Sequence, residues 1–359
     1  MAFALFAAAC TIAAVVYVSL AARRVSPPNA PGREPLAAPS AAPAQDTVSS
    51  RLAELRRDAH LYYRSARTGE VGQIVVASLS DPEGQRWVSP LHCDRAHFSR
   101  DLGVCVQGRT SGLGGQVDVQ LIDGELRTRQ RFEFDGFPSR ARVASDGRFA
   151  SVTLFVSGDD YEADFSTRTK IFDVAANRLL PDIEFFDVER DGQPFASVDF
   201  NYWGVTFVEG SSHAYATLGT GGKTHLVRTD IAARQVQTLR EDAECPSLSP
   251  SGKRLAYKQR AGAAGTWRLH VLELDSLTSR PVSGEARSVD DQVEWLDEQR
   301  IVYGVYRDPE RQELGADLWM SPIDGQAEET ARLWLPLASS PAIIRHRATM
   351  PSAMSTRSQ

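Results

Sequence analysis

An aspartate that follows a short apolar stretch and precedes a turn recurs along the chain once every 42 to 57 residues. Each copy joins two such stretches, and a second strand–turn–strand unit comes before most copies. Short apolar stretches separated by Gly, Asp, Asn and Pro are typical of β-hairpins. Two hairpins per period make a four-stranded antiparallel sheet, which is one blade of a β-propeller. The recurring residues are Asp81, Asp123, Asp173, Asp230, Asp275 and Asp324.

The number of blades depends on the strand that begins each blade. These strands carry an apolar-x-apolar signature before their turn, but a predicted helix at residues 49–60 takes that place in the first blade. Residues 340–345, SPAIIR, repeat the signature, and a C-terminal strand in the first blade would close the ring and remove two exposed sheet edges. We therefore predict an all-β fold, a six-bladed β-propeller over residues 51–345 closed by a C-terminal strand. The signatures are Ala96/Phe98, Ala141/Val143, Val205/Phe207, Pro246/Leu248, Val293/Trp295 and Ala342/Ile344.

Composition excludes two broad classes of protein. Hydrophobic residues make up 42% and charged residues 24% of the 359 residues, values that a disordered chain would not have. Lys+Arg 40 against Asp+Glu 46 gives a net charge of −6, which argues against a nucleic-acid partner. The seven histidines show no metal-ligand spacing, so we predict neither a metal site nor a cofactor.

The N-terminus predicts a membrane segment followed by a spacer. Residues 2–22 contain no charge and no proline, and about 20 apolar residues span a bilayer as a helix. Residues 1–24 are therefore interpreted as a signal anchor or transmembrane helix, residues 25–50 as a Pro/Ala-rich spacer and residues 346–359 as a disordered tail. Arg23, Arg24 and Arg33 after the segment favour a cytoplasmic body, whereas an N-terminal apolar segment usually directs export. We expect a single-pass membrane protein with an extracytoplasmic propeller.

One repeat also carries a family resemblance. The stretch SLSPSGKRLAYK, followed by WRLHVLELDSLTSRPV, resembles the repeat of TolB-like, WD40-like propellers, in which Ser-Pro-Asp/Ser-Gly-Lys precedes a strand. The match is good in the fifth blade and partial in the third and sixth. This resemblance implies an exported, non-enzymatic propeller that acts as a protein-binding platform in the cell envelope. A membrane anchor and a spacer stand here where TolB has an α/β domain, so membrane-anchored TolB-like propellers of GC-rich bacteria are the closer likeness.

Candidate binding residues follow from position in the propeller. The residues at the start of each innermost strand converge on one rim of the central channel, and here they are polar and carry both charge signs. We predict that this rim binds an envelope protein or peptide. A rival hypothesis is a hydrolase or lyase that uses Asp290, Asp291 and Glu244 as acid and base. The rim residues are Asp94, Arg95, Arg140, Arg142, Asn201, Tyr202, Glu244, Asp290 and Asp291.

Two other motifs receive ordinary interpretations. Residues 219–224, GTGGKT, resemble a phosphate-binding loop, but Thr217 replaces its first glycine and a strand follows where a helix is needed. We predict a plain hairpin there. The acidic cluster Asp159, Asp160, Glu162 and Asp164 lacks the spacing of a calcium loop and is interpreted as a solvated excursion between strands.

The cysteines yield a prediction about hairpin register. With a turn centred near Asp101–Leu102, Cys105 would lie opposite Phe98, about 16 Å along the strand from Cys93. A disulfide needs Cα atoms within about 7 Å. We therefore predict that Cys105 is a small buried core residue and that Cys93 is a free thiol near the rim.

Overall fold

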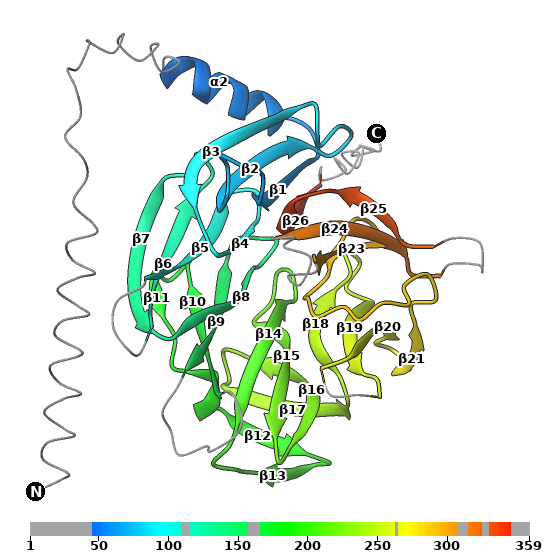
Figure 1. The fold of residues 1–359 in the computed structure, drawn as a ribbon. Helices are drawn as coiled ribbons and strands as arrows, with labels where there is room; N and C mark the ends of the chain where they lie inside the picture. The colour runs from blue at the N-terminus through cyan, green and yellow to red at the C-terminus, as the bar shows by residue number, and fades with distance from the viewer. Residues whose placement is uncertain are drawn as a thin grey trace, which may run out of the picture. The chain divides into compact units, whose positions relative to one another are not determined.

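Six sheets follow one another along the chain, and each is one blade of a propeller (Figure 1). The structure is a computed structural model that describes residues 45–109, 115–156, 166–262, 265–307, 315–324 and 330–345. We number the blades along the chain and name the strands of each from the channel outward. Blade 1 contains β26 (Ala338–Ile344), β1 (His60–Ser65), β2 (Gln73–Ser78) and β3 (Arg86–His92). Blade 2 contains β4 (Arg95–Phe98), β5 (Leu102–Arg109), β6 (Gln116–Asp123) and β7 (Thr128–Asp135).

The remaining blades repeat this order, with one exception in blade 4. Blade 3 contains β8 (Phe137–Val143), β9 (Phe149–Val156), β10 (Ser166–Asp173) and β11 (Arg178–Leu179). Blade 4 contains β14 (Asn201–Phe207), β15 (His213–Thr220), β16 (Lys223–Asp230) and β17 (Gln235–Glu241), with β12 (Asp187–Arg190) and β13 (Gln193–Phe195) added outside β17. Blade 5 contains β18 (Glu244–Leu248), β19 (Arg254–Arg260), β20 (Trp267–Glu273) and β21 (Thr278–Pro281). Blade 6 contains β22 (Glu294–Trp295), β23 (Arg300–Tyr306), β24 (Ala316–Pro322) and β25 (Arg332–Leu335).

The innermost strands form a closed ring. In order around the channel, β26, β4, β8, β14, β18 and β22 each contact the next, and β22 contacts β26. Strand β26 pairs with β1 in antiparallel register, with Tyr62 opposite Ala342. The C-terminal strand therefore provides the innermost strand of blade 1, the place in which the sequence predicts residues 340–345.

The core lies between neighbouring blades, and the strand patterns reflect this. Middle strands such as β2 and β9 are almost wholly buried because a blade packs against each of their faces. Val104 and Val119 of blade 2, for example, share one apolar cluster with Val152 of blade 3. The outermost strand β7 instead alternates between half-buried and exposed residues, since only one of its faces meets protein.

One helix precedes the propeller and ends earlier than predicted. Helix α2 (Gln45–Leu55) buries Leu52 and Leu55 against Tyr62 and Phe98 of the first two blades. The predicted helix at residues 49–60 was wrong at its end, because His60 already pairs with Ser78 in the sheet. Residues 45–50, which the sequence assigns to an extended spacer, are helical in α2.

Several predicted segments lie outside the described residues. They are the membrane segment 2–22, spacer residues 25–44, the tail 346–359 and the acidic cluster Asp159, Asp160, Glu162 and Asp164. Across the described ranges, no helix is long and apolar enough to cross a membrane. The hairpin predicted at residues 219–224 is confirmed: Thr220 pairs with Lys223, and Gly221 and Gly222 take the positive φ that a two-residue turn requires.

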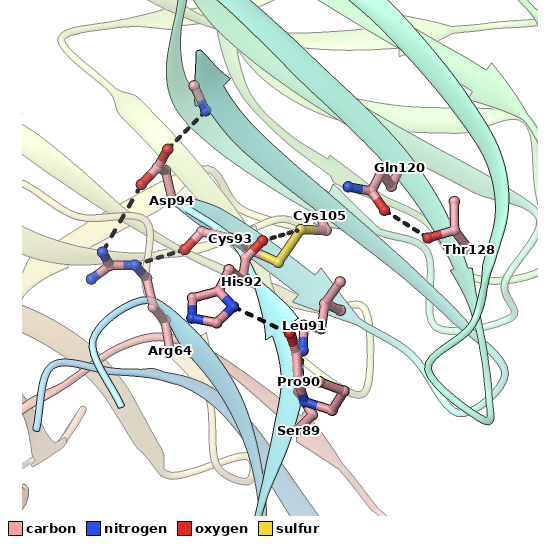
Figure 2. Close-up of a disulfide and its surroundings, with 11 residues drawn as sticks. Arg64, Ser89, Pro90, Leu91, His92, Cys93, Asp94, Cys105, Gln120 and Thr128 are labelled. Carbon is pink, nitrogen blue, oxygen red and sulfur yellow. Dashed lines mark hydrogen bonds and ion pairs between the residues drawn. A yellow bond between two sulfur atoms is a disulfide. The ribbon is translucent and has the colours of Figure 1, made fainter. Parts of the chain in front are cut away.

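The prediction that Cys93 is a free thiol was wrong. Cys93 and Cys105 form a disulfide with their Cα atoms 5.4 Å apart (Figure 2). The predicted hairpin register was two residues off, because Cys105 pairs with Ala96 instead of Phe98. The chain also bends at Asp94, whose amide donates to the Val106 carbonyl, and this bend brings Cys93 back over the strand. Cys105 is buried, as predicted, and Cys245 is a buried free thiol.

Candidate functional site in the central channel

The channel has two mouths with different geometry. At the start-side mouth, where the innermost strands begin, the Arg95 guanidinium donates to the Tyr306 hydroxyl at 2.9 Å and Arg140 donates to Asp290 Oδ1 at 3.2 Å. Lys258 also bonds to Asp290. These contacts join blades 2, 3, 5 and 6 across the opening. They leave a cavity of only about 30 Å³, lined by Arg95, Arg140 and Asp291.

The three carboxylates of the hydrolase or lyase hypothesis are all engaged in structural contacts. Glu244 is 3.0 Å from Arg260 and 3.6 Å from Lys258. Asp291 accepts hydrogen bonds from the amides of Gly304 and Gln292 at 2.8 and 2.9 Å. Burial alone would raise the pKa of Asp290, but Lys258 and Arg140 lower the pKa below its ordinary value. For Asp290, this environment favours the ionised carboxylate over proton transfer.

Three predicted rim residues serve other contacts. Asp94 accepts a hydrogen bond from the Gly108 amide at 2.8 Å in blade 2. Asn201 Oδ1 accepts one from the Thr167 amide at 2.7 Å and so joins blades 3 and 4. Tyr202 is wholly buried in the apolar cluster between those blades. Of the nine predicted rim residues, the structure therefore brings five together across the start-side mouth, whereas these three lie at or near the starts of their strands but make their contacts elsewhere.

Arg142, the ninth predicted residue, lies deep in the channel and connects four blades. Its guanidinium bonds to Glu294 of blade 6, to Ser247 Oγ of blade 5 at 2.9 Å and to the Val293 carbonyl at 3.0 Å. His97 Nε2 of blade 2 is 3.3 Å from Glu294. Burial would raise the pKa of Glu294, but Arg142 and His97 lower the pKa to about 2. Burial and Arg142 lower the pKa of His97, so the imidazole stays neutral near pH 7.

This ion pair belongs to a ring of six residues around the channel, one from each blade. Each is the middle residue of an apolar-x-apolar signature, and all six line one cavity of about 610 Å³. The flanking apolar residues point into the blades, so the middle residue must point into the channel. This alternation is the signal that the rim prediction missed. The channel ring comprises His97, Arg142, Thr206, Ser247, Glu294 and Ile343.

The cavity opens at the end-side mouth, where the innermost strands end. Its rim includes Arg100, Ser145, Glu209, Ser251 and Arg345. Arg345 donates to the Leu296 carbonyl at 3.0 Å, and Arg100 donates to the Arg345 carbonyl at 3.2 Å. Both guanidinium groups donate to backbone carbonyls, and within the part of the chain that is described neither lies within salt-bridge distance of a carboxylate. Arg345 nevertheless contributes to the lowered pKa of Glu294. In those same ranges, no group of three or more His, Cys, Asp or Glu side chains could hold a metal ion.

Fold and channel together define a closed six-bladed β-propeller. The structure is similar to TolB from Acinetobacter baumannii, with a TM-score of 0.55 and 12% identity over 79% of this chain. The match spans 66% of that TolB chain, just under two thirds of its length. It is also similar to a chain of a nidogen/laminin complex, with a TM-score of 0.51 and 10% identity over 79% of this chain and 98% of that one. No family model and no curated protein matches the sequence. At such identities, the likeness concerns the fold alone.

Proposed function

We propose that this protein is a non-enzymatic, membrane-anchored propeller that binds a protein partner in the cell envelope through its end-side mouth. The observation that carries the proposal is the cavity of about 610 Å³ to which all six blades contribute. A cavity of this size accepts a peptide segment or a side-chain cluster. The start-side mouth is less suitable because its ionic contacts nearly close it.

Charge suggests which segment of a partner would enter. Among the described residues, the guanidinium groups of Arg100 and Arg345 donate hydrogen bonds to backbone carbonyls at the rim, whereas Arg142 deeper in the channel is neutralised by Glu294. An acidic segment would therefore gain charge-assisted hydrogen bonds at the rim. The fold similarity to a chain of a nidogen/laminin complex agrees with a protein partner in general terms.

Two features support the envelope location. The Cys93–Cys105 disulfide suits an oxidising compartment, since disulfides seldom persist in the cytosol. Residues 2–22 have the length and apolar character of an export signal that remains as an anchor. The hydrolase or lyase hypothesis gains no comparable support, because its carboxylates are held by neighbouring cations and amides.

Site-specific photo-crosslinking in intact cells tests the proposal. A photoreactive residue at Ser145, which is exposed at the end-side mouth, should capture one envelope protein in stoichiometric amount. A photoreactive residue at Asp94, which is exposed on the start side, should not capture this protein. Arg100→Glu should reduce this capture at least fivefold because it reverses a rim charge. Arg95→Glu, at the start-side mouth, is the matched control and should leave capture unchanged. Capture from position 94 alone, or equal loss with both variants, would place the partner elsewhere.

A further inference from the structure

The insertion in blade 4 forms a second cavity, remote from the channel. A short 3-10 helix, η1 (Ile183–Phe185), leads into β12 and β13, and β12 pairs in parallel with β17 at the outer edge of the blade (Figure 1). These added elements and strands β15 to β17 enclose about 780 Å³. This volume lies within the usual range of small-molecule sites.

Aromatic side chains form much of the wall of this cavity. The side chain of Phe185 is 77% exposed, which is a large fraction for a phenylalanine, so it does not form part of the hydrophobic core. The rings of Phe195 and Phe200 meet edge to face at 5.4 Å between centroids. Arg190 lies over the Phe195 ring at 3.9 Å, so an aromatic ring of the insertion already takes part in a cation–π contact. The aromatic lining residues are Phe185, Phe186, Phe195 and Phe200.

The polar lining residues carry an excess of negative charge. Four carboxylates line the cavity, against one guanidinium, Arg228, and one imidazole, His213. Among the described residues, Asp230 accepts hydrogen bonds from a local network that includes the amides of Ala232 and Ala233. The cavity therefore presents aromatic surface and net negative charge together. The four carboxylates belong to Glu184, Asp187, Glu189 and Asp230.

Among these four carboxylates, Glu184 has a buried oxygen atom. Its Oε1 accepts a hydrogen bond from the Thr169 amide at 3.1 Å, but its buried Oε2 has no hydrogen-bond partner among the described residues. The hydroxyl of nearby Tyr202, which is wholly buried, has none either. A buried carboxylate oxygen without a donor carries an uncompensated desolvation cost. A donor supplied by a ligand would remove that cost.

We propose that this cavity binds a small organic cation, an amine carried on an apolar or aromatic body. The ammonium group would pair with the carboxylate of Glu184, whose buried Oε2 would turn toward the cavity to accept its hydrogen bond, and the apolar body would lie against Phe185 and Phe200. Burial raises the pKa of Glu184 to about 7, and a bound ammonium would favour the ionised carboxylate. This inference does not depend on the function proposed for the channel, since the two cavities share no lining residue.

Calorimetric titration of the full chain with three probes of similar shape tests the charge requirement. The probes are phenethylamine (cationic), 2-phenylethanol (neutral) and 3-phenylpropanoate (anionic). We expect the amine to bind at least tenfold more tightly than either of the others at pH 8, where Glu184 is largely ionised. Equal affinity for the three probes, or tighter binding of the anion, would overturn the proposal.

Two variants with matched controls test the location. Glu184→Gln should weaken phenethylamine at least tenfold, and Phe185→Ala should weaken it about threefold to tenfold. Glu83→Gln and Phe137→Ala, exposed residues of blades 1 and 3, should leave the affinity unchanged. If Glu184→Gln fails to fold, Phe185→Ala decides, because so exposed a side chain is dispensable for folding. Unchanged binding in both site variants would show that the amine does not enter this cavity.

Discussion

Arg142 reaches side chains of three other blades, and this makes it the most connected charge in the channel. A buried ion pair adds little net stability compared with apolar residues, but removing one partner leaves the other charge buried and unpaired. Glu294 also holds its charge with the help of His97. These contacts fix the geometry at the floor of the proposed binding cavity.

The lowered pKa of Glu294 predicts acid sensitivity. The folded-state pKa of about 2 lies below the ordinary value of 4.5, so the stabilisation is complete above pH 4.5 and is lost as pH falls toward 2. The wild type should lose about 1.4 kcal/mol of unfolding free energy per pH unit from this residue below pH 4.5. Urea unfolding between pH 7 and pH 3 measures this loss. Glu294→Gln should lack that part of the slope, whereas Glu83→Gln, more than half exposed, should retain it. Parallel pH profiles for the wild type and Glu294→Gln would contradict the prediction.

The Cys93–Cys105 disulfide should contribute measurably to stability. It closes a loop of sequence separation 12, for which restriction of the unfolded chain corresponds to about 3 kcal/mol. Dithiothreitol should therefore lower the unfolding midpoint of the wild type in urea. The Cys93→Ala/Cys105→Ala variant should start from a lower midpoint and show no response to the reductant. A midpoint in the wild type that does not move on reduction would count against the disulfide.

At the residue scale, the rim prediction contained only one of the six residues of the channel ring. The rim prediction located Arg142 but not His97 or Glu294, although both occupy the middle position of a signature that the sequence displays. Strand alternation was sufficient to place them in the channel. The disulfide was not predicted for a different reason. An error of two residues in the register of one hairpin changes the distance between every pair of residues across it, including Cys93 and Cys105.

At the scale of elements, the regular blades were predictable and the insertion was not. Asp-Gly and Ser-Gly turns between alternating stretches mark local hairpins, and their pairing follows from proximity in sequence. Strand β12 instead pairs in parallel with β17, whose first residue comes 48 positions after Asp187. A parallel pairing of separated segments leaves no local signal. The cavity under the insertion was therefore invisible to sequence reasoning.

The pairing of β26 with β1 predicts a sharp difference between two truncations. Deleting residues 339–359 removes the buried side chains of Ala342 and Ile344 and exposes an apolar edge on β1. We expect aggregation or a fall of several kcal/mol in the unfolding free energy. Deleting residues 347–359 keeps all of β26 and the contacts of Arg345 with blade 6, so we expect little change. Thermal melts and soluble yields measure both. If the two truncated chains behave alike, β26 does not close the ring.

At the scale of the whole molecule, both chain ends of the propeller lie on the side of the open mouth. His60, the first residue of β1, is opposite Ile344, the last residue of β26. Arg56, just after α2, bonds to the Arg100 carbonyl, and Arg100 bonds to the Arg345 carbonyl. The end of helix α2 therefore lies beside the end-side mouth.

Export of the propeller leads to a prediction that can be measured inside cells. If residues 1–24 direct export, the full chain should carry an oxidised Cys93–Cys105 pair, because the disulfide forms in an oxidising compartment. A chain that lacks residues 1–24 should remain in the cytosol, with both thiols free. Trapping free thiols with an alkylating reagent at lysis, followed by non-reducing peptide mapping, distinguishes the two states. Adding an unrelated cleavable export signal to the shortened chain should restore the disulfide and so exclude a folding defect. Equal alkylation of the full and shortened chains would mean that residues 1–24 do not export the propeller.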